Sequence, residues 1–288
     1  MVSSELRSVF VDVSGRVRSG WVLISYGVIL ALVHVPLSMG SHFLIRNAGP
    51  PSIDDWRNIG STGPLLISNL VASLACSKLF REPMSFEPHP RRSFWWGGAL
   101  GATCLTATVV GASLAGHGTL TLGFGTWSMN EIVISALTQL VVIGAGSVGE
   151  ELFFRGLPFH ALSRGTHPLA AIVLTSLIFG VGHLNNPNSS WVAAANIALV
   201  GLLFGLVSWR GSLWASIGLH VSWNWFEGFV FGQPVSGLQP GPGLFKAGWL
   251  IEGGFWSGGD FGPEASGVTS LVLISAIIFS VALLRTSQ

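Results

Sequence analysis

Long apolar segments alternate with short polar ones along the whole chain. Eight of the apolar segments approach the roughly 20 residues that a helix needs to cross a bilayer. Each is bounded by charged residues or by clusters of glycine, proline or asparagine, which tend to end helices. The eight segments are residues 20–40, 61–80, 95–115, 130–162, 168–184, 190–209, 212–231 and 266–285. The pattern predicts an all-α fold, a polytopic membrane bundle of about eight transmembrane helices.

The composition agrees with a membrane protein. Of the 288 residues, 9% are charged and 49% are hydrophobic, whereas an average soluble domain carries about 25% charged residues. A water-soluble protein of this size could not cover its surface with so few charges. The net charge of +1 argues against a nucleic-acid partner, because phosphate binding requires clustered Lys and Arg. Cys76 and Cys104 fall inside apolar segments, so we expect small buried side chains and no disulfide or metal site.

Lysine and arginine are unevenly distributed over the segments that connect the predicted spans. With the N-terminus inside the cell, ten of them fall on the inner side and three on the outer side. The inner residues are Arg7, Arg16, Arg18, Lys78, Arg81, Arg91, Arg92, Arg164, Arg210 and Arg285, and the outer ones are Arg46, Arg57 and Lys246. A bias of this kind sets the orientation of membrane proteins. It predicts that both termini are cytoplasmic, in what we expect to be the plasma membrane.

Three groups of polar residues interrupt the apolar spans, each at a helical spacing. They are Glu150-Glu151-x-x-x-Arg155, Phe179-x-x-x-His183 and His220-x-x-x-Asn224. At spacing i, i+4, Glu151 and Arg155 share a helix face, and the acid precedes the base, which is the favourable order for an ion pair. Glu150 points about 100° away from its neighbour and stays free for another role.

The three groups are predicted to lie at a common depth. Counted from the inner-side arginines at about 1.5 Å per residue, Glu150, His183 and His220 lie roughly 15–22 Å from the inner face. A charged group at that depth costs several kcal/mol, so such residues usually line a cavity and carry function. Gly180 and Gly182 beside His183 predict that another helix approaches closely there.

Simpler interpretations remain open for single residues. A lone histidine in an apolar helix is more often a packing residue than a catalyst, and we interpret His34, His117, His160 and His167 in this way. The Glu151–Arg155 pair alone could be a structural cross-brace. The combined set suits two kinds of chemistry: hydrolysis by an activated water with an oxyanion hole, or proton or ion translocation. Asn224 donates hydrogen bonds without titrating, which favours the oxyanion hole.

In order and spacing the motifs, including EELFFRG at residues 150–156, resemble those of the CPBP family of intramembrane proteases, related to the CAAX prenyl endopeptidases. The stretch GGDFGPEAS before the last span also resembles the family. The resemblance implies that Glu150 and His183 activate water and that His220 and Asn224 support the oxyanion. Glu151, Arg155 and Phe179 would be supporting residues.

The resemblance also implies a division of the chain and a function. Residues 1–129 would be N-terminal transmembrane helices, residues 130–231 a CPBP-like catalytic helical core, and residues 232–288 a Gly/Pro-rich loop and the last transmembrane helix. The expected function is an intramembrane endopeptidase of the CAAX type that acts on a peptide or lipidated protein and contacts membrane lipids. The alternatives are a non-catalytic immunity or scaffold protein and a small transporter. A transporter would show paired inverted halves, and we detect none.

The motif residues also bear on a metal requirement, and the aromatic residues beside them bear on a substrate groove. Members of the family are often described as metallopeptidases, and Glu150, His183 and His220 could supply three ligands to Zn2+. The chain lacks H-E-x-x-H, and a zinc site would leave Asn224 as the only obvious oxyanion donor, so we expect no metal requirement. Several aromatic residues flank the motifs and either face lipid and core or line a groove for a lipid chain or apolar peptide. They are Phe153, Phe154, Trp223, Trp225 and Phe226.

Overall fold

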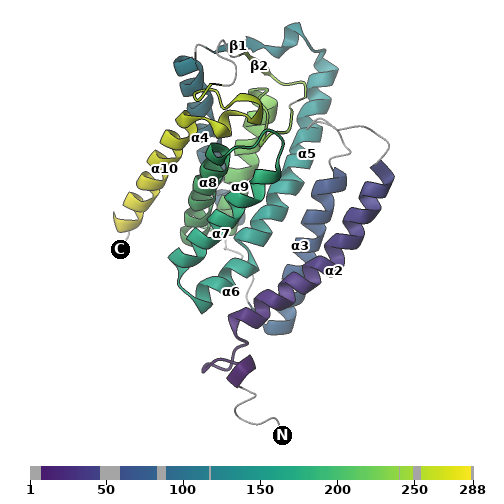
Figure 1. The fold of residues 1–288 in the computed structure, drawn as a ribbon, viewed down its shortest axis with the longest axis vertical. Coiled ribbons are helices and arrows are strands. Elements are labelled where there is room, and N and C mark those ends of the chain that lie inside the picture. The colour runs from purple at the N-terminus through teal and green to yellow at the C-terminus, as the bar shows by residue number, and fades with distance from the viewer. Residues whose placement is uncertain are drawn as a thin grey trace.

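The computed structural model describes residues 8–45, 59–82, 89–116, 118–239, 241–248 and 254–286. Helices dominate, and two short strands pair outside them (Figure 1). The helices are α2 (Ser19–Ile45), α3 (Ile59–Phe80), α4 (Pro90–Gly116), α5 (Met129–Phe154), α6 (Leu157–Gly165), α7 (Pro168–Gly182), α8 (Trp191–Arg210), α9 (Leu213–Trp225) and α10 (Gly267–Thr286). A single π-helical turn, Phe226–Val230, continues α9.

The helical membrane bundle expected from the hydrophobic pattern is confirmed. Within the described residues, six stretches are long and apolar enough to cross a membrane, and Gly267–Ala282 of α10 forms a shorter apolar helix. In Figure 1, α2 and α3 form a pair on one side of α5, and α4, α8, α9 and α10 lie on the other. This arrangement places α5 at the middle of the bundle.

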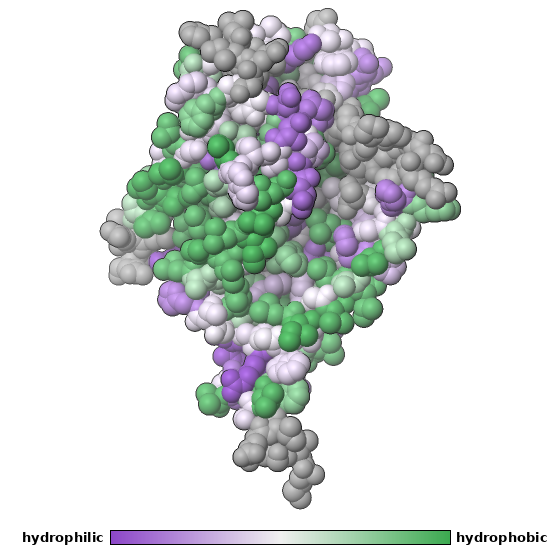
Figure 2. Space-filling view, in the orientation of Figure 1, coloured by the Kyte–Doolittle hydropathy of each residue, from purple (hydrophilic) through white to green (hydrophobic). Residues whose placement is uncertain are grey.

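The outer surface of the bundle is apolar where lipid would cover it. Side chains on the outward face of α7 are more than about a third exposed although they are large and hydrophobic; they are Leu169, Val173, Leu174, Leu177, Ile178 and Val181. Figure 2 shows hydrophobic residues across the middle of this face and hydrophilic residues toward the ends. An apolar band of this kind on a helical protein is suited to the hydrocarbon core of a bilayer.

The fourth predicted span is not one continuous helix. Residues 130–162 hold two helices, because α5 ends at Phe154 and α6 begins at Leu157. A Cβ atom on Gly156 would lie 2.3 Å from the carbonyl oxygen of Leu152, so the turn accepts only glycine. Pro158 in the first turn of α6 has no N–H to give to a preceding turn, which fits a helix start and not a helix interior.

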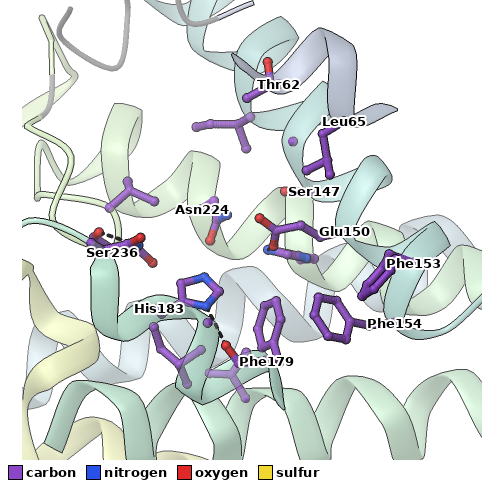
Figure 3. A pocket seen from close by; sticks show the side chains of 18 of the residues that line it. Thr62, Leu65, Ser147, Glu150, Phe153, Phe154, Phe179, His183, Asn224 and Ser236 are labelled. Carbon is purple, nitrogen blue, oxygen red and sulfur yellow. Dashed lines mark hydrogen bonds and ion pairs between the residues drawn. The ribbon is translucent and has the colours of Figure 1, made fainter. Parts of the chain in front are cut away.

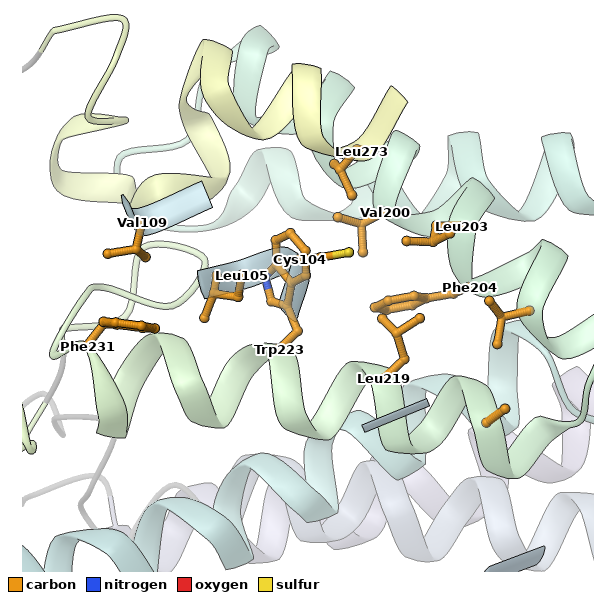
Figure 4. Close-up of a cluster of buried hydrophobic side chains, with 12 residues drawn as sticks. Cys104, Leu105, Val109, Val200, Leu203, Phe204, Leu219, Trp223, Phe231 and Leu273 are labelled. Atoms are coloured by element: carbon orange, nitrogen blue, oxygen red, sulfur yellow. The ribbon is translucent and has the colours of Figure 1, made fainter. Parts of the chain in front are cut away.

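The core lies between α4, α8, α9 and α10 (Figure 4). Its fully buried members come from all four helices and include Leu105, Leu203, Phe204, Leu219, Trp223 and Leu273. Cys104 belongs to this core, and Cys76 is buried between α2, α3 and α6. Both cysteines are free, as expected. The packing fixes α9, which carries His220 and Asn224.

The close helix approach predicted at Gly180 and Gly182 is confirmed at one of the two positions. A Cβ atom on Gly180 would lie 2.4 Å from the carbonyl oxygen of Ala194, so α7 and α8 approach each other there. A Cβ atom on Gly182 would have nothing within 4 Å. The second half of the prediction is therefore wrong, because two residues along a helix turn by about 200°, so Gly182 points away from the side on which Gly180 meets α8.

The segment after α9 contains more structure than the predicted loop. Strand β2 (Phe245–Gly248) pairs antiparallel with β1 (Thr119–Leu122), and Thr119 stands opposite Gly248. Two 3-10 turns, Gly259–Phe261 and Pro263–Ala265, precede α10. The loop therefore returns to the bundle before the last helix starts.

Candidate active site

A buried ion pair lies at the C-terminal end of α5. Arg155 donates from its NH1 group to Oε1 of Glu151 at 2.9 Å, and both side chains are 0% exposed. The pair forms at the i, i+4 spacing from which it was predicted. Each charge neutralises the other, which a fully buried position requires.

Glu151 also connects α5 to α9. The ring atom Nδ1 of His220 lies 3.0 Å from Oε1 of Glu151, and Ser216 donates a hydrogen bond from its hydroxyl to Oε2. A carboxylate can only accept, so the proton of this histidine contact resides on Nδ1. The bond directs Nε2 of His220 away from Glu151.

Arg155 is held by further contacts on its other sides. Its NH2 group donates to the carbonyl oxygen of Gly201 on α8 at 3.1 Å. The guanidinium lies 4.8 Å from the ring centre of Phe179 and 5.3 Å from that of Phe204, distances at which a cation is attracted to an aromatic face. Arg155 therefore joins α5, α7 and α8 behind the site.

A cavity of about 580 Å³ opens in front of this ion pair. Its lining includes the four residues that the sequence singled out for chemistry, namely Glu150, His183, His220 and Asn224. Figure 3 shows the side chains of Glu150, His183 and Asn224 pointing into the same space. The residues come from α5, the end of α7, and α9, so the bundle brings together three motifs that are far apart in sequence.

Glu150 faces the cavity and keeps hydrogen-bonding capacity. Its side chain is 30% exposed, and its Oε2 atom lies 3.7 Å from Nε2 of His220. That distance exceeds a hydrogen bond. A water molecule or a substrate group can therefore bind to this carboxylate.

His183 is oriented by the end of its own helix. It is the C-cap residue of α7, and its Nδ1 atom lies 2.7 Å from the carbonyl oxygen of Phe179. A carbonyl oxygen can only accept, so Nδ1 carries the proton. In the neutral ring Nε2 then holds the lone pair. Phe179, which is 3% exposed, thus sets the tautomer of His183 with its backbone while its ring covers Arg155.

Asn224 is half-buried at the cavity wall. The described part of the chain provides no hydrogen-bond partner for its side-chain amide. Two amide N–H donors are therefore available to a ligand in the cavity.

The possible metal ligands can be located in the structure. Among the described residues, no group of three or more His, Cys, Asp or Glu is placed to hold a metal ion. His220 uses Nδ1 for Glu151, and its Nε2 lies 3.7 Å from the nearest Glu150 oxygen. The three residues that could supply zinc ligands, Glu150, His183 and His220, all line one cavity.

The histidines interpreted as packing residues are found in varied places. His34 hydrogen bonds with Ser68 at 3.2 Å and Ser38 at 3.1 Å, and it also lines the cavity, which the sequence did not indicate. His167 caps α7 by accepting from the N–H of Leu169. His160 is half-buried against Phe159, and His117 lies outside the described residues.

The flanking aromatic residues divide into two groups. Phe153 and Phe154 line the cavity. Trp223 is 1% exposed inside the core, and Trp225 donates from its indole N–H to the carbonyl oxygen of Ala136. Those two and Phe226 are not among the cavity's described lining residues. The groove hypothesis is therefore limited to the two phenylalanines on α5.

Two residues of the cavity wall were missed as site residues. Ser236 follows α9, and Glu264 precedes α10; both line the cavity. Glu264 lies in the GGDFGPEAS stretch, which the sequence had marked only as a family feature. The signal for its position was that stretch itself, in which Glu264 is one of two acidic residues among glycines and small residues before the last span.

Comparison with protein families supports the resemblance indicated by the motifs. Residues 130–226 match the family described as type II CAAX prenyl endopeptidase Rce1-like. The matched segment is about a third of the 288-residue chain and contains all three motifs. Comparison with curated proteins gives no match. The family match confirms the resemblance to CPBP and CAAX proteases, and with the apolar helices it indicates an integral membrane protein.

Proposed function

Proceeding from the match of residues 130–226 to the type II CAAX prenyl endopeptidases, we propose that this protein is an intramembrane endopeptidase that hydrolyses peptide bonds with an activated water. The observation that carries the proposal is the single cavity lined by Glu150, His183, His220 and Asn224. Glu150 and His183 can accept protons, and the amide of Asn224 donates hydrogen bonds without titrating. Hydrolysis needs both a proton acceptor for the water and a donor for the oxyanion, and all three side chains face the same cavity.

The water-activating pair would be Glu150 and His183. The carboxylate of Glu150 and the Nε2 lone pair of His183 both accept hydrogen bonds, so together they orient the two hydrogens of one water molecule. As the water oxygen attacks the substrate carbonyl carbon, one proton passes to this pair. The pair then returns the proton to the leaving amine when the C–N bond breaks.

The oxyanion would be stabilised by Asn224 and His220. Asn224 donates from its amide N–H groups. His220 donates from Nε2 when both ring nitrogens are protonated; its Nδ1 lies 3.0 Å from Glu151 and its Nε2 lies 3.7 Å from Glu150. Fixed donors in a site of low dielectric are usually the largest single contribution to this type of catalysis.

The protein's own residues are sufficient for this mechanism without a metal. We therefore propose that no cofactor is required. The aligned donors of His220 and Asn224 would then take the role that a Lewis acid has in a zinc peptidase.

Membrane lipids and an apolar peptide would be the partners. One end of the cavity is lined by Leu30, Leu65, Phe153 and Phe154, from α2, α3 and α5. An aliphatic and aromatic wall of this kind suits a lipid chain or an apolar peptide segment, as in a membrane-associated or prenylated substrate. No nucleic-acid partner is proposed.

We further propose a plasma-membrane location with both termini cytoplasmic. The segments assigned to the inner side lie together, since Arg164 donates to the carbonyl oxygen of Val17 and pairs with Glu82. Lys246, assigned to the outer side, belongs to the strand that pairs with β1. In Figure 1, α2 runs upward and α10 runs downward, which supports termini on one side. Terminal reporters that are active only outside the cell would contradict this topology.

The experiment that tests the function is terminal proteomics of membranes that contain either the parent protein or Glu150→Ala at equal abundance. The parent is expected to create new peptide termini in membrane-associated proteins, and Glu150→Ala is expected to create none. Identical termini in the two membranes would contradict the proposal.

A further inference from the structure

The loop before α10 returns to the cavity and is fixed there. Asn196 of α8 is 2% exposed, and its amide N–H donates to the carbonyl oxygens of Glu264 at 2.7 Å and Ser266 at 2.9 Å. Its Oδ1 atom accepts from the hydroxyl of Ser270 at 2.6 Å. One buried asparagine thus holds both the loop and the first turn of α10 against the bundle.

The side chain of Glu264 is oriented by a second segment. Its Oε2 atom accepts from the backbone N–H of Ser236 at 2.8 Å and from the hydroxyl of the same residue at 2.7 Å. Ser236 has φ of 47°, a left-handed conformation that is uncommon for serine. The strained residue presents both donors to one carboxyl oxygen, which fixes the carboxyl group.

The other oxygen of Glu264 is available to the cavity. Glu264 is 4% exposed and lines the cavity, and the described residues provide no hydrogen-bond partner for Oε1. In Figure 3, Ser236, which holds Glu264, lies on the opposite side of His183 from Glu150. The cavity therefore has a carboxyl group on each side of the proposed water-activating histidine.

The charged residues of the cavity wall have one sign. Glu150 and Glu264 are both part of the lining, and none of the described lining residues is Lys or Arg. Arg155 is absent from the lining and is already paired with Glu151. Burial raises the pKa of the Glu264 carboxyl because it removes water from the ionised form. A bound cationic group could stabilise that ionised form in place of water.

We propose that Glu264 determines substrate specificity by selecting a positively charged side chain next to the scissile bond. This inference rests on the proposed protease function and adds the class of substrate. Oε1 of Glu264 would accept a charge-assisted hydrogen bond from a lysine or arginine of the bound peptide. A free C-terminal carboxylate in the same position would be repelled by Glu264, because the described wall has no lysine or arginine that could pair with it.

The test uses purified protein in lipid nanodiscs and lipidated peptides that differ at one position beside the cleaved bond. The position carries lysine, norleucine of similar length, or glutamate. The parent is expected to cleave the lysine peptide with about 10- to 100-fold higher kcat/KM than the norleucine peptide, the range of a hydrogen bond to a charged group. Glu264→Gln retains the shape and the Ser236 bonds and is expected to lose this preference while its rate on norleucine stays near that of the parent.

Two further variants control for indirect effects. Asp260→Asn removes an exposed carboxyl of the same loop that is not part of the described cavity lining, and it is expected to keep the preference. Ser236→Ala removes one of the two bonds to Oε2 and is expected to reduce the preference partially, which keeps the test valid if Glu264→Gln does not fold. A parent without preference, or a Glu264→Gln protein that retains it, would overturn the inference.

A binding measurement separates failure of this inference from failure of the proposed function. Fluorescence anisotropy gives the affinity of the labelled lysine and norleucine peptides for the parent and for Glu264→Gln. If no peptide is cleaved, but the parent binds the lysine peptide more tightly than the norleucine peptide and Glu264→Gln does not, the protease proposal fails and the specificity role stands. If the peptides are cleaved and neither binding nor cleavage depends on Glu264, the specificity role fails and the protease proposal stands.

Discussion

The last turn of α5 has one face toward α9 and another toward the cavity, and the two faces differ in how fully their polar groups are bonded. On the first face Glu151 is 0% exposed and bonds with Arg155, Ser216 and His220. On the second face Glu150 is 30% exposed, and the nearest histidine nitrogen is 3.7 Å away. Adjacent residues of one helix thus have opposite environments because each residue turns about 100° from the last.

The difference in bonding suits Glu151 to a structural role and Glu150 to a chemical one. A buried carboxylate whose partners are all present cannot exchange them during a reaction without large cost, so the Glu151 face is suited to hold the helices in place. A carboxylate that retains free acceptor sites can bind water and take up a proton. The comparison therefore assigns stability to one glutamate and chemistry to its neighbour.

Glu150→Gln gives the largest expected effect. The amide cannot accept a proton from water, so kcat for a cleavable peptide is expected to fall by about 100- to 10,000-fold. Thermal unfolding in detergent should stay within about 0.5 kcal/mol of the parent, because the residue is partly exposed and makes no close bond. A variant that cleaves at the parental rate would place the proton acceptor elsewhere.

Arg155→Ala tests the opposite face. It leaves the Glu151 carboxylate buried without its cation, which typically costs about 3–5 kcal/mol. The midpoint of thermal unfolding in detergent and the cleavage rate are expected to fall together. Arg210→Ala is the matched control, since Arg210 is exposed at the end of α8, and it should leave both values nearly unchanged. Equal stability of Arg155→Ala and the parent would show that the Glu151–Arg155 ion pair does not stabilise the fold.

Asn224→Ala removes one proposed oxyanion donor without touching the ion pair. Loss of such a donor typically lowers kcat by about 100- to 1,000-fold. KM for the same peptide is expected to change little, because the donor acts mainly on charge that develops during the reaction. Steady-state kinetics on Asn224→Ala and on the exposed control Asn185→Ala separates the two parameters. A rise in KM alone would make Asn224 a binding residue.

Ser216→Ala has a smaller expected effect. The variant removes one hydrogen bond to a buried carboxylate, worth about 1.5–3 kcal/mol, and leaves the ion pair intact. Ser222→Ala is the control on the same helix, because Ser222 donates to the neutral carbonyl oxygen of Leu219 at 3.1 Å. Chemical denaturation should show a clearly larger loss for Ser216→Ala than for Ser222→Ala. Equal losses would mean that Glu151 does not depend on α9.

Metal removal is expected to have no effect. Incubation with a chelator followed by dialysis should leave the cleavage rate unchanged, and elemental analysis of purified protein should find zinc well below one atom per chain. Loss of activity on chelation with recovery on adding zinc would contradict the metal-free mechanism.

Much of the candidate site could be predicted because its residues follow helical spacing. Glu151 and Arg155 are one turn apart, and so are Phe179 and His183, so local geometry alone predicts each contact. Counting residues from the arginines at the inner face predicted that Glu150, His183 and His220 reach a similar depth, and they line one cavity. These predictions needed only the rise and rotation of a helix.

Contacts between distant segments could not be predicted in this way. The bond between Ser236 and Glu264 and the pairing of β1 with β2 join residues whose relation depends on how the whole bundle packs. The break after α5 had a local signal in Gly156 and Pro158, but the continuous apolar pattern favoured a single span. The sequence predicted a packing role for His34, and only the packing of α2 on α3, which in turn packs on α5, brings it to the cavity.

The attachment of the last loop by Asn196 has a consequence for the order in which the site is made. A ribosome delivers α5, α7 and α9 to the membrane well before residue 264, so three walls of the cavity precede the fourth. The hydrogen bonds from Asn196 on α8 to the carbonyl oxygens of Glu264 and Ser266 can form only after those residues, just before α10, have been synthesised. The nascent chain thus acquires Glu150, His183 and Asn224 early and its complete cavity late, and Glu264 is the last carboxyl group of the cavity to be placed.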